Sequence, residues 1–331
     1  MTTIVLCYPV KPEQLEQIQR AAPAYRIISS DQERIAEDIF SADIYCGHAR
    51  GGLPWEEIVR REKLSWIQSS AAGLDHCLHP AVVNSDIIVS GSSGLFAVQV
   101  AEQTLAILLG LLRRIPLFHS AQQVRHYERQ PTDDLQGKTV GIFGLGLNGQ
   151  QIARVLKPFD VRLMGCDRFP EAAENQVDFP VLPHTSSLEL FRRSDIIIAA
   201  LPLTPETRNL IDAEHFAACR KGSYFLNVGR GQTVVESALG NALRTGQLTA
   251  AGLDVVALEP LPQDSDVWNW PNVLVTPHVG AQSARRYQTV TDFFVENLRR
   301  WQTGGMLLNL VDKQLGFPLP EHRLRLPRIS G

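Results

Sequence analysis

Short runs of valine, isoleucine and leucine alternate along the chain with longer stretches in which apolar residues recur every three or four positions. The short runs predict β-strands and the longer stretches predict amphipathic helices. Strands alternating with helices in this way indicate a parallel sheet covered on both faces. In the first hundred residues the predicted strands are 4–8, 26–30, 44–46, 65–69 and 87–91, and the predicted helices lie near 12–21, 32–41 and 54–62.

A long amphipathic run over residues 96–126 interrupts this alternation, and Pro116 is expected to kink or break it. From Asp312 onward the chain carries several prolines and arginines, which indicate an extended arm or a disordered end. Between these two segments the predicted strands are 139–143, 162–166, 195–200, 223–228, 251–255 and 273–276, and the predicted helices lie near 147–157, 186–193, 234–245 and 283–302.

Length and charge narrow the class of protein. The 331 residues suggest two domains, at about 150 residues each. A net charge of −3 argues against nucleic acid or an anionic membrane as the main partner. Five scattered cysteines without a CxxC pair argue against a disulfide framework or a zinc site. With no export signal and no apolar run of about 20 residues, the chain is predicted to be cytoplasmic.

A glycine-rich turn follows the strand predicted at 139–143. Gly144, Gly146 and Gly149 form a GxGxxG pattern that leads directly into a predicted helix. Such glycines allow a tight turn, a close approach of pyrophosphate to the backbone and close helix–strand packing. The next strand ends at Asp167, 18 residues after Gly149. This separation is close to the roughly 20 residues expected for a carboxylate that accepts hydrogen bonds from the adenosine ribose. Because this carboxylate repels a 2′-phosphate, NAD is predicted in preference to NADP, although the neighbouring Arg168 can soften that preference.

Three polar residues follow later predicted strands, and each has a residue type suited to acid–base chemistry on a keto acid. Arg230 can hold a substrate carboxylate or polarise its carbonyl. His278 can exchange a proton with the substrate oxygen. Glu259 can orient the imidazole and favour its protonated form. Taken singly, each residue is more often structural, but carboxyl ends of parallel strands share one edge, so together they predict a catalytic site.

The chain resembles the D-isomer-specific 2-hydroxyacid dehydrogenases, in particular those similar to glyoxylate/hydroxypyruvate reductases. The resemblance extends from the first strand to about residue 310. Besides the segments above, it rests on Ala72-Gly73-Leu74-Asp75-His76, on Val100 to Thr104 and on Leu201 to Thr207. The glycine loop departs from the family pattern at Leu147 and Asn148, where arginine and isoleucine are usual. A loop tryptophan common in the family is absent, and Tyr127 is the aromatic residue nearest its place.

The resemblance implies an α/β protein with two Rossmann- or flavodoxin-like, doubly wound parallel-sheet domains. A substrate domain of residues 1–97 plus 285–331 would carry an inserted NAD-binding domain of residues 98–284. The family's catalytic residues correspond to Arg230, Glu259 and His278. Substrate contacts correspond to Ala71, Ala72 and Gly73, with His76 beside them. Cofactor contacts correspond to Thr104, Gly144, Gly146, Asn148, Gly149, Asp167, Pro202, Thr207, Val228, Gly229, Asp254 and Gly280. Family members are usually homodimers, with much of the contact expected from 97–114.

The leading hypothesis is therefore an NAD-dependent oxidoreductase that interconverts a small D-2-hydroxy acid and its 2-keto acid, with no metal required. The alternative is a dinucleotide-sensing, corepressor-like binding protein of the same fold. Formate oxidation ranks lower, because Gln282-Ser283 do not match that branch. Neither the identity of the hydroxy acid nor the physiological direction follows from the sequence.

Overall fold

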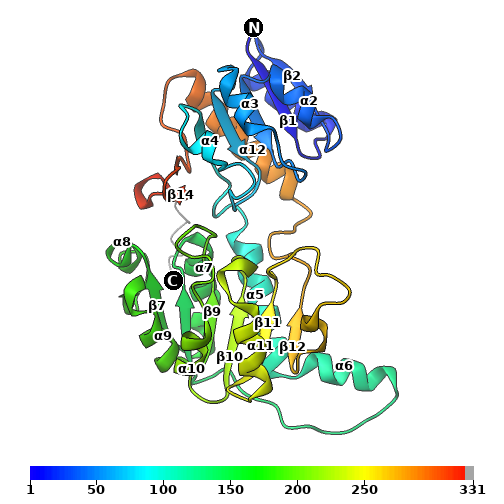
Figure 1. Cartoon of the computed structure of the whole chain (residues 1–331), viewed down its shortest axis with the longest axis vertical. Helices are drawn as coiled ribbons and strands as arrows, with labels where there is room; N and C mark the ends of the chain where they lie inside the picture. The colour runs from blue at the N-terminus through cyan, green and yellow to red at the C-terminus, as the bar shows by residue number, and fades with distance from the viewer. Residues whose placement is uncertain (325–331) are drawn as a thin grey trace. The chain divides into compact units, whose positions relative to one another are not determined.

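The computed structural model describes residues 1–324; the predicted tail residues 325–331 lie outside this description. The chain forms two compact units, one containing Met1–Phe96 and the chain from Ser283 onward, the other Ala97–Gln282 (Figure 1). The second unit is thus inserted into the sequence of the first. Both are built on parallel sheets, which confirms the predicted fold class.

The first unit contains a five-stranded sheet in the order β2-β1-β3-β4-β5. The strands β1, β3 and β4 are completely buried, whereas β2 at the edge is partly exposed. Its strands are β1 (Thr3–Cys7), β2 (Arg26–Ser29), β3 (Ile44–Gly47), β4 (Trp66–Ser69) and β5 (Ile88–Ser90), and its helices are α1 (Pro12–Ala21), α2 (Ile35–Asp38), α3 (Trp55–Arg60), α4 (Pro80–Val83) and α12 (Arg286–Gln302), with 3-10 turns η1 (Ile39–Ser41) and η6 (Pro320–His322).

The last long helix, α12, packs back onto this sheet. The Trp66 ring lies 5.5 Å from Phe294 and 5.3 Å from Trp301, measured between ring centroids. These contacts bury large aromatic surfaces and connect α12 to strand β4 of the first unit.

Of the two alternatives predicted for the tail, the disordered end is wrong for residues 312–324, which form an arm with defined contacts. Strand β13 (Val311–Asp312) pairs antiparallel with β14 (Phe317–Pro318). Lys313 Nζ donates to the carbonyls of Val82 at 3.2 Å and Ile87 at 3.1 Å. The segment is ordered because its polar groups find backbone partners in the first unit, which composition alone does not reveal.

The second unit contains a seven-stranded parallel sheet in the order β12-β11-β10-β9-β6-β7-β8. The order reverses between β6 and β9, and ligands of such sheets bind at the carboxyl ends of the strands beside this reversal. Its strands are β6 (Thr139–Phe143), β7 (Arg162–Asp167), β8 (Val181–Pro183), β9 (Ile196–Ala199), β10 (Ser223–Asn227), β11 (Leu248–Leu253) and β12 (Val273–Val275).

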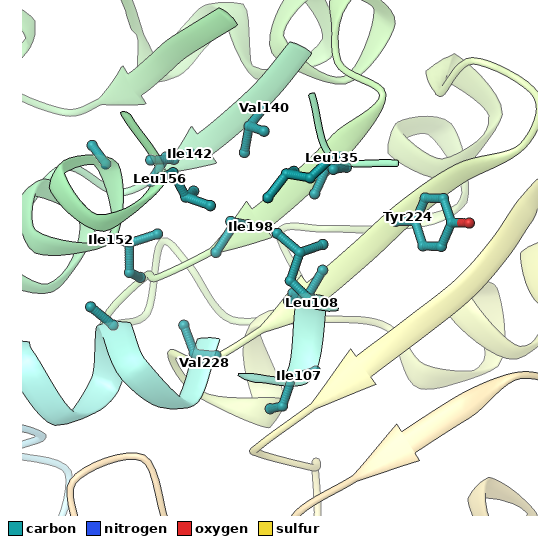
Figure 2. Packing of buried hydrophobic residues seen from close by; sticks show 14 of the residues in the cluster. Ile107, Leu108, Leu135, Val140, Ile142, Ile152, Leu156, Ile198, Tyr224 and Val228 are labelled. Carbon is teal, nitrogen blue, oxygen red and sulfur yellow. The ribbon is translucent and has the colours of Figure 1, made fainter. Parts of the chain in front are cut away.

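Helices cover both faces of this sheet. The helices of this unit are α5 (Ala97–Leu112), α6 (Ile115–Gln123), which has no buried residue, α7 (Leu147–Leu156), α8 (Pro170–Glu174), α9 (Ser187–Arg193), α10 (Ala213–Ala218) and α11 (Glu236–Arg244), with 3-10 turns η2 (Lys157–Phe159), η3 (His184–Ser186), η4 (Gly231–Thr233) and η5 (Asp266–Asn269). Alternate strand residues point to opposite faces: Ile198 packs with α5 and α7, as Figure 2 shows, whereas Ile197 belongs to the opposite cluster. This double burial explains the nearly continuous apolar runs.

The long run predicted over 96–126 is two helices, α5 and α6, bent by 67°. The break comes at Arg114, whose φ of 51° is left-handed, and Pro116 lies in the first turn of α6. A proline is well accommodated there because the first helical N–H groups have no partner within the helix. Across residues 1–324 no single helix meets the length and hydropathy of a membrane span, and only α5 and α6 taken together pass by length and composition.

Candidate active site

Two of the three predicted catalytic side chains are in direct contact. His278 Nδ1 lies 2.7 Å from Glu259 Oε2, so the imidazole and the carboxylate form a hydrogen bond. His278 follows β12, and Glu259 follows the adjacent strand β11. Both side chains are between a third and a half exposed. With Nδ1 bound to the carboxylate, the other ring nitrogen, Nε2, is the atom available for proton exchange.

The charge state of Glu259 follows from its surroundings. Burial alone would raise its pKa, but the hydrogen bond and charge of His278, the Val256 N–H at 3.2 Å and the charge of Arg230 together lower the pKa below its usual 4.5. Glu259 is therefore ionised at neutral pH. An ionised carboxylate at this position stabilises the protonated imidazole.

Arg230 lies on the loop after β10, the neighbour of β11 in the sheet. Its Nη1 donates to the Gly229 carbonyl at 2.8 Å. The next residue must be glycine, because a Cβ at Gly231 would lie 1.9 Å from the backbone of Val256. In addition, Glu236 Oε1 accepts from the Ala257 N–H at 2.7 Å. The loops that carry Arg230 and Glu259 are thus packed backbone to backbone.

The backbone of His278 is unusual, with a left-handed φ of 53° that few residues other than glycine adopt. Asp254 holds this loop: Oδ1 accepts from Thr276 Oγ1 at 2.6 Å and from Val279 N at 3.0 Å, and Oδ2 accepts from Gly280 N at 2.8 Å. The structure thus places this residue, predicted as a cofactor contact, in the support of the histidine loop.

Sequence reasoning did not single out the groups behind this support. Gln103 Nε2 of α5 donates to Thr276 Oγ1 at 3.1 Å, which links the helix to the histidine loop. Glu236 was also missed. Gln103 lies inside the family-like segment Val100 to Thr104, and that placement was the available signal; Glu236 lies in no such segment.

The glycine turn after β6 fits a dinucleotide. Gly144 has a left-handed φ of 96°, and a Cβ at Gly149 would lie 2.0 Å from the Gly144 carbonyl oxygen. By contrast, a Cβ at Gly146 would meet no atom within 4 Å. Gly146 is also the N-cap of α7, whose first N–H groups have no partner within the helix. Open space above a helix N-terminus suits a pyrophosphate.

Asp167 ends β7 and is 8% exposed. Its Oδ2 accepts from Leu145 N at 2.7 Å, and its Oδ1 accepts from Phe169 N at 2.8 Å. Each carboxylate oxygen can accept a further bond, so ribose hydroxyls can still be bound. The adjacent Arg168 forms an ion pair with Glu206.

The other predicted cofactor contacts fall into two groups. Most lie beyond the carboxyl ends of β6, β9, β10 and β12: Asn148 is in the first turn of α7, and the loop residues are Pro202, Thr207, Val228, Gly229 and Gly280. Within this group, Thr207 Oγ1 donates to the Pro202 carbonyl at 2.7 Å and so shapes the loop after β9. Thr104 differs, because its side chain is buried in α5 and its hydroxyl donates to the Val100 carbonyl at 2.7 Å.

The predicted substrate contacts lie in the first unit, directly after β4. The Ala71 N–H donates to Ser69 Oγ at 3.1 Å, which also lies 3.3 Å from His76 Nε2. In the described part of the chain the N–H groups of Ala72 and Gly73 have no hydrogen-bond partner. The loop therefore presents two backbone donors, and Ser69, which sequence reasoning missed, holds its shape.

Comparisons with known proteins identify the family of this chain. The sequence profile of the "D-isomer specific 2-hydroxyacid dehydrogenase, NAD binding domain" matches residues 105–280. The human glyoxylate reductase/hydroxypyruvate reductase is 34% identical over 246 residues, which cover 71% of this chain and 73% of that protein. A D-3-phosphoglycerate dehydrogenase of Methanocaldococcus jannaschii is 28% identical over 315 residues; the match covers 94% of this chain but only 60% of that protein's length.

A solved structure is also similar. The D-isomer specific 2-hydroxyacid dehydrogenase of Xanthobacter autotrophicus Py2, in complex with NADPH and MES, superposes with a TM-score of 0.78 at 30% identity. The superposition covers 96% of this chain and all of that one. The predicted resemblance is confirmed, and this chain belongs to the D-isomer specific 2-hydroxyacid dehydrogenase family of oxidoreductases.

Proposed function

We propose that this protein interconverts a small D-2-hydroxy acid and its 2-keto acid, with a nicotinamide dinucleotide as the hydride carrier. The observation that carries the proposal is the 2.7 Å contact between His278 and Glu259, on adjacent strand ends of a dinucleotide-binding sheet. A protein that only senses dinucleotide has no need of an imidazole paired with an ionised carboxylate. The catalytic proposal is therefore favoured over a corepressor-like binding protein.

The proton in this reaction is carried by His278. When bound, the dinucleotide supplies or accepts the hydride. During reduction His278 Nε2 gives its proton to the substrate oxygen, and during oxidation it takes the proton back. Glu259 keeps Nδ1 oriented and stabilises the positive charge on the ring.

Arg230 and the loop after β4 hold the substrate in this proposal. The Arg230 guanidinium remains charged at any working pH and polarises the carbonyl or binds the carboxylate. The N–H groups of Ala72 and Gly73 bind the substrate carboxylate, supported by Ala71, and His76 borders the same loop. Two backbone donors aimed at a carboxylate give charge-assisted hydrogen bonds.

For the cofactor we propose NAD rather than NADP. The Asp167 carboxylate would repel a 2′-phosphate, and Arg168, the group that could attract one, is already paired with Glu206. The similar Xanthobacter autotrophicus structure holds NADPH, and a measurement of both cofactors tests the preference in this protein. We expect kcat/KM for NADH to exceed that for NADPH by about tenfold or more, since placing two negative charges side by side disfavours binding. Equal efficiencies would contradict the role of Asp167.

A spectrophotometric assay of NADH oxidation with glyoxylate, hydroxypyruvate, pyruvate and bulkier 2-keto acids tests the function itself. Turnover of at least one of these acids is expected. If the protein binds NADH but turns over no acid in the panel in either direction, the sensor alternative gains support and the catalytic proposal fails.

We also propose a homodimer. No residue of α6 is buried within the single chain, and Ile115, Leu117, Val124 and Tyr127 are between 47% and 98% exposed on and after this helix. Several large apolar side chains exposed on one short segment indicate a contact surface. Sedimentation should show a dimer, and Val124→Asp combined with Ile115→Asp should give monomers; a monomeric wild type would overturn the proposal.

A cytoplasmic location is proposed as well, because all five cysteines are buried and unpaired, as a reducing compartment allows. Cell fractionation tests it.

A further inference from the structure

A cavity of about 440 Å³ lies in the first unit, at the carboxyl ends of β3 and β4. Its walls come from the loop after β3 and from the loop after β4, which also carries the proposed carboxylate-binding amides. Leu53 and Trp55 give it an apolar part, and Arg50, His48, His76 and His79 also line it. His76 Nε2 lies 3.3 Å from Ser69 Oγ, and His79 Nδ1 accepts from the Ala81 N–H at 3.2 Å, so Arg50 is the basic group that needs explanation.

Specific contacts hold both loops in place. The side-chain amide of Gln32 forms two hydrogen bonds with the first loop: Oε1 accepts from Arg50 N at 2.8 Å, and Nε2 donates to the His48 carbonyl at 3.0 Å. The second loop is held by Trp55, the buried first residue of α3, whose Nε1 donates to the His76 carbonyl at 3.3 Å. The rings of His48 and His76 lie 4.1 Å apart, so the two loops touch across the cavity.

The charge of the cavity is set by Arg50. Among residues 1–324 no carboxylate is recorded in an ion pair with this guanidinium, whereas Arg34, Arg60, Arg61 and Arg300 of the same unit each pair with an acid. Asp75 is the acidic residue in the lining, and it already interacts with other groups of the chain. The charged, planar guanidinium of an arginine in a cavity is suited to a carboxylate or a phosphate.

We propose that this cavity binds a second anionic group, a carboxylate or a phosphate, at the far end of the 2-keto acid substrate. The inference rests on the proposed function and narrows its substrate class. Ala72 and Gly73, which are proposed to bind the carboxylate next to the keto group, precede Asp75 and His76 on one loop. A substrate anchored by those amides can extend its tail into a cavity of the same unit, where Arg50 receives the anion.

Matched pairs of substrates test this inference. The terminal methyl of 2-oxopentanoate is replaced by a carboxylate in 2-oxoglutarate, and hydroxypyruvate differs from 3-phosphohydroxypyruvate only by the phosphate. We expect the anionic member of at least one pair to have a kcat/KM about tenfold or more above its partner, and the pair that responds identifies the anion. Because charge-assisted bonds of arginine are strong and geometry-dependent, Arg50→Gln should lower the kcat/KM of that acid by about 10- to 100-fold.

Two further variants make the result specific. Arg50→Lys should recover part of the loss, since it restores charge without the planar fork. Arg60→Gln should behave like wild type, because the Arg60 side chain is exposed at the end of α3 in the same unit. The uncharged partner acid should change by less than about threefold in every variant.

Three results would overturn the inference. One is equal efficiency for the charged and uncharged members of both pairs. Another is an equal loss for both members in Arg50→Gln, which would mean that Arg50 serves the carboxylate common to all 2-keto acids. If no acid is turned over, the proposed function fails, and calorimetric titration of the full chain still tests the cavity. There, absence of binding by glutarate and inorganic phosphate, or binding unchanged in Arg50→Gln, is the third contrary result.

Discussion

Replacing His278 by glutamine is expected to lower kcat for 2-keto acid reduction by about 10²- to 10⁴-fold, the usual contribution of a positioned acid–base group. Glutamine can still form hydrogen bonds, but it cannot give up a proton at the position of Nε2. Affinity for NADH, measured by fluorescence titration, should stay within about threefold of wild type, since the dinucleotide contacts lie mainly on other loops. A variant that keeps more than a tenth of wild-type kcat would show that the proton comes from another group.

Glu259→Gln is the informative partner of that variant. The imidazole keeps a hydrogen-bonding neighbour but loses the negative charge that stabilises its protonated form. As the pH is raised, the rate of reduction by the variant should therefore begin to decline at a lower pH than the rate of wild type. At acidic pH the variant should lose less of its rate. A pH–rate profile unchanged in shape would separate Glu259 from proton transfer.

The second large effect is expected at Arg230. Arg230→Gln should reduce kcat/KM by about 10²- to 10³-fold, because a guanidinium that polarises a carbonyl acts most strongly in the transition state. The kcat/KM of Arg230→Lys should lie between those of Arg230→Gln and wild type, since the ammonium retains the charge but cannot bind in bidentate fashion. Steady-state kinetics with the best acid of the panel provides the measurement.

Arg244→Gln is a suitable control for this series, because Arg244 ends α11 of the same unit and is exposed to solvent. It should leave kcat and KM unchanged. If Arg230→Gln raised KM alone and left kcat intact, Arg230 would bind substrate and transition state equally, and its polarising role would be rejected.

Much of the fold could be predicted because buried parallel strands have a simple sequence pattern. Helix α1 and strand β6 have the predicted bounds. Strand β11 was predicted at 251–255 but runs from Leu248 to Leu253. Its Ala-Ala-Gly segment lacks β-branched residues, yet smallness is what this position requires: a Cβ at Gly252 would lie 2.2 Å from Ile107 of α5. Packing against α5, which leaves no local pattern, thus requires glycine at this position of the strand.

The candidate site divides in a similar way. The contact between His278 and Glu259 could be expected from two segments that follow neighbouring strands. The roles of Asp254 and Gln103 could not, since each depends on a polar side chain that reaches backbone or hydroxyl groups of a distant segment. Such contacts have no periodicity in the sequence and become visible only in three dimensions.

The left-handed backbone of His278 has a consequence for how this protein can change over time. A residue with a β-carbon pays a steric penalty at such an angle, which glycine avoids. Folding stability alone would thus favour drift from histidine to glycine at this position, and proton transfer alone would oppose it. At position 278, selection for folding stability and selection for catalytic activity therefore act in opposite directions.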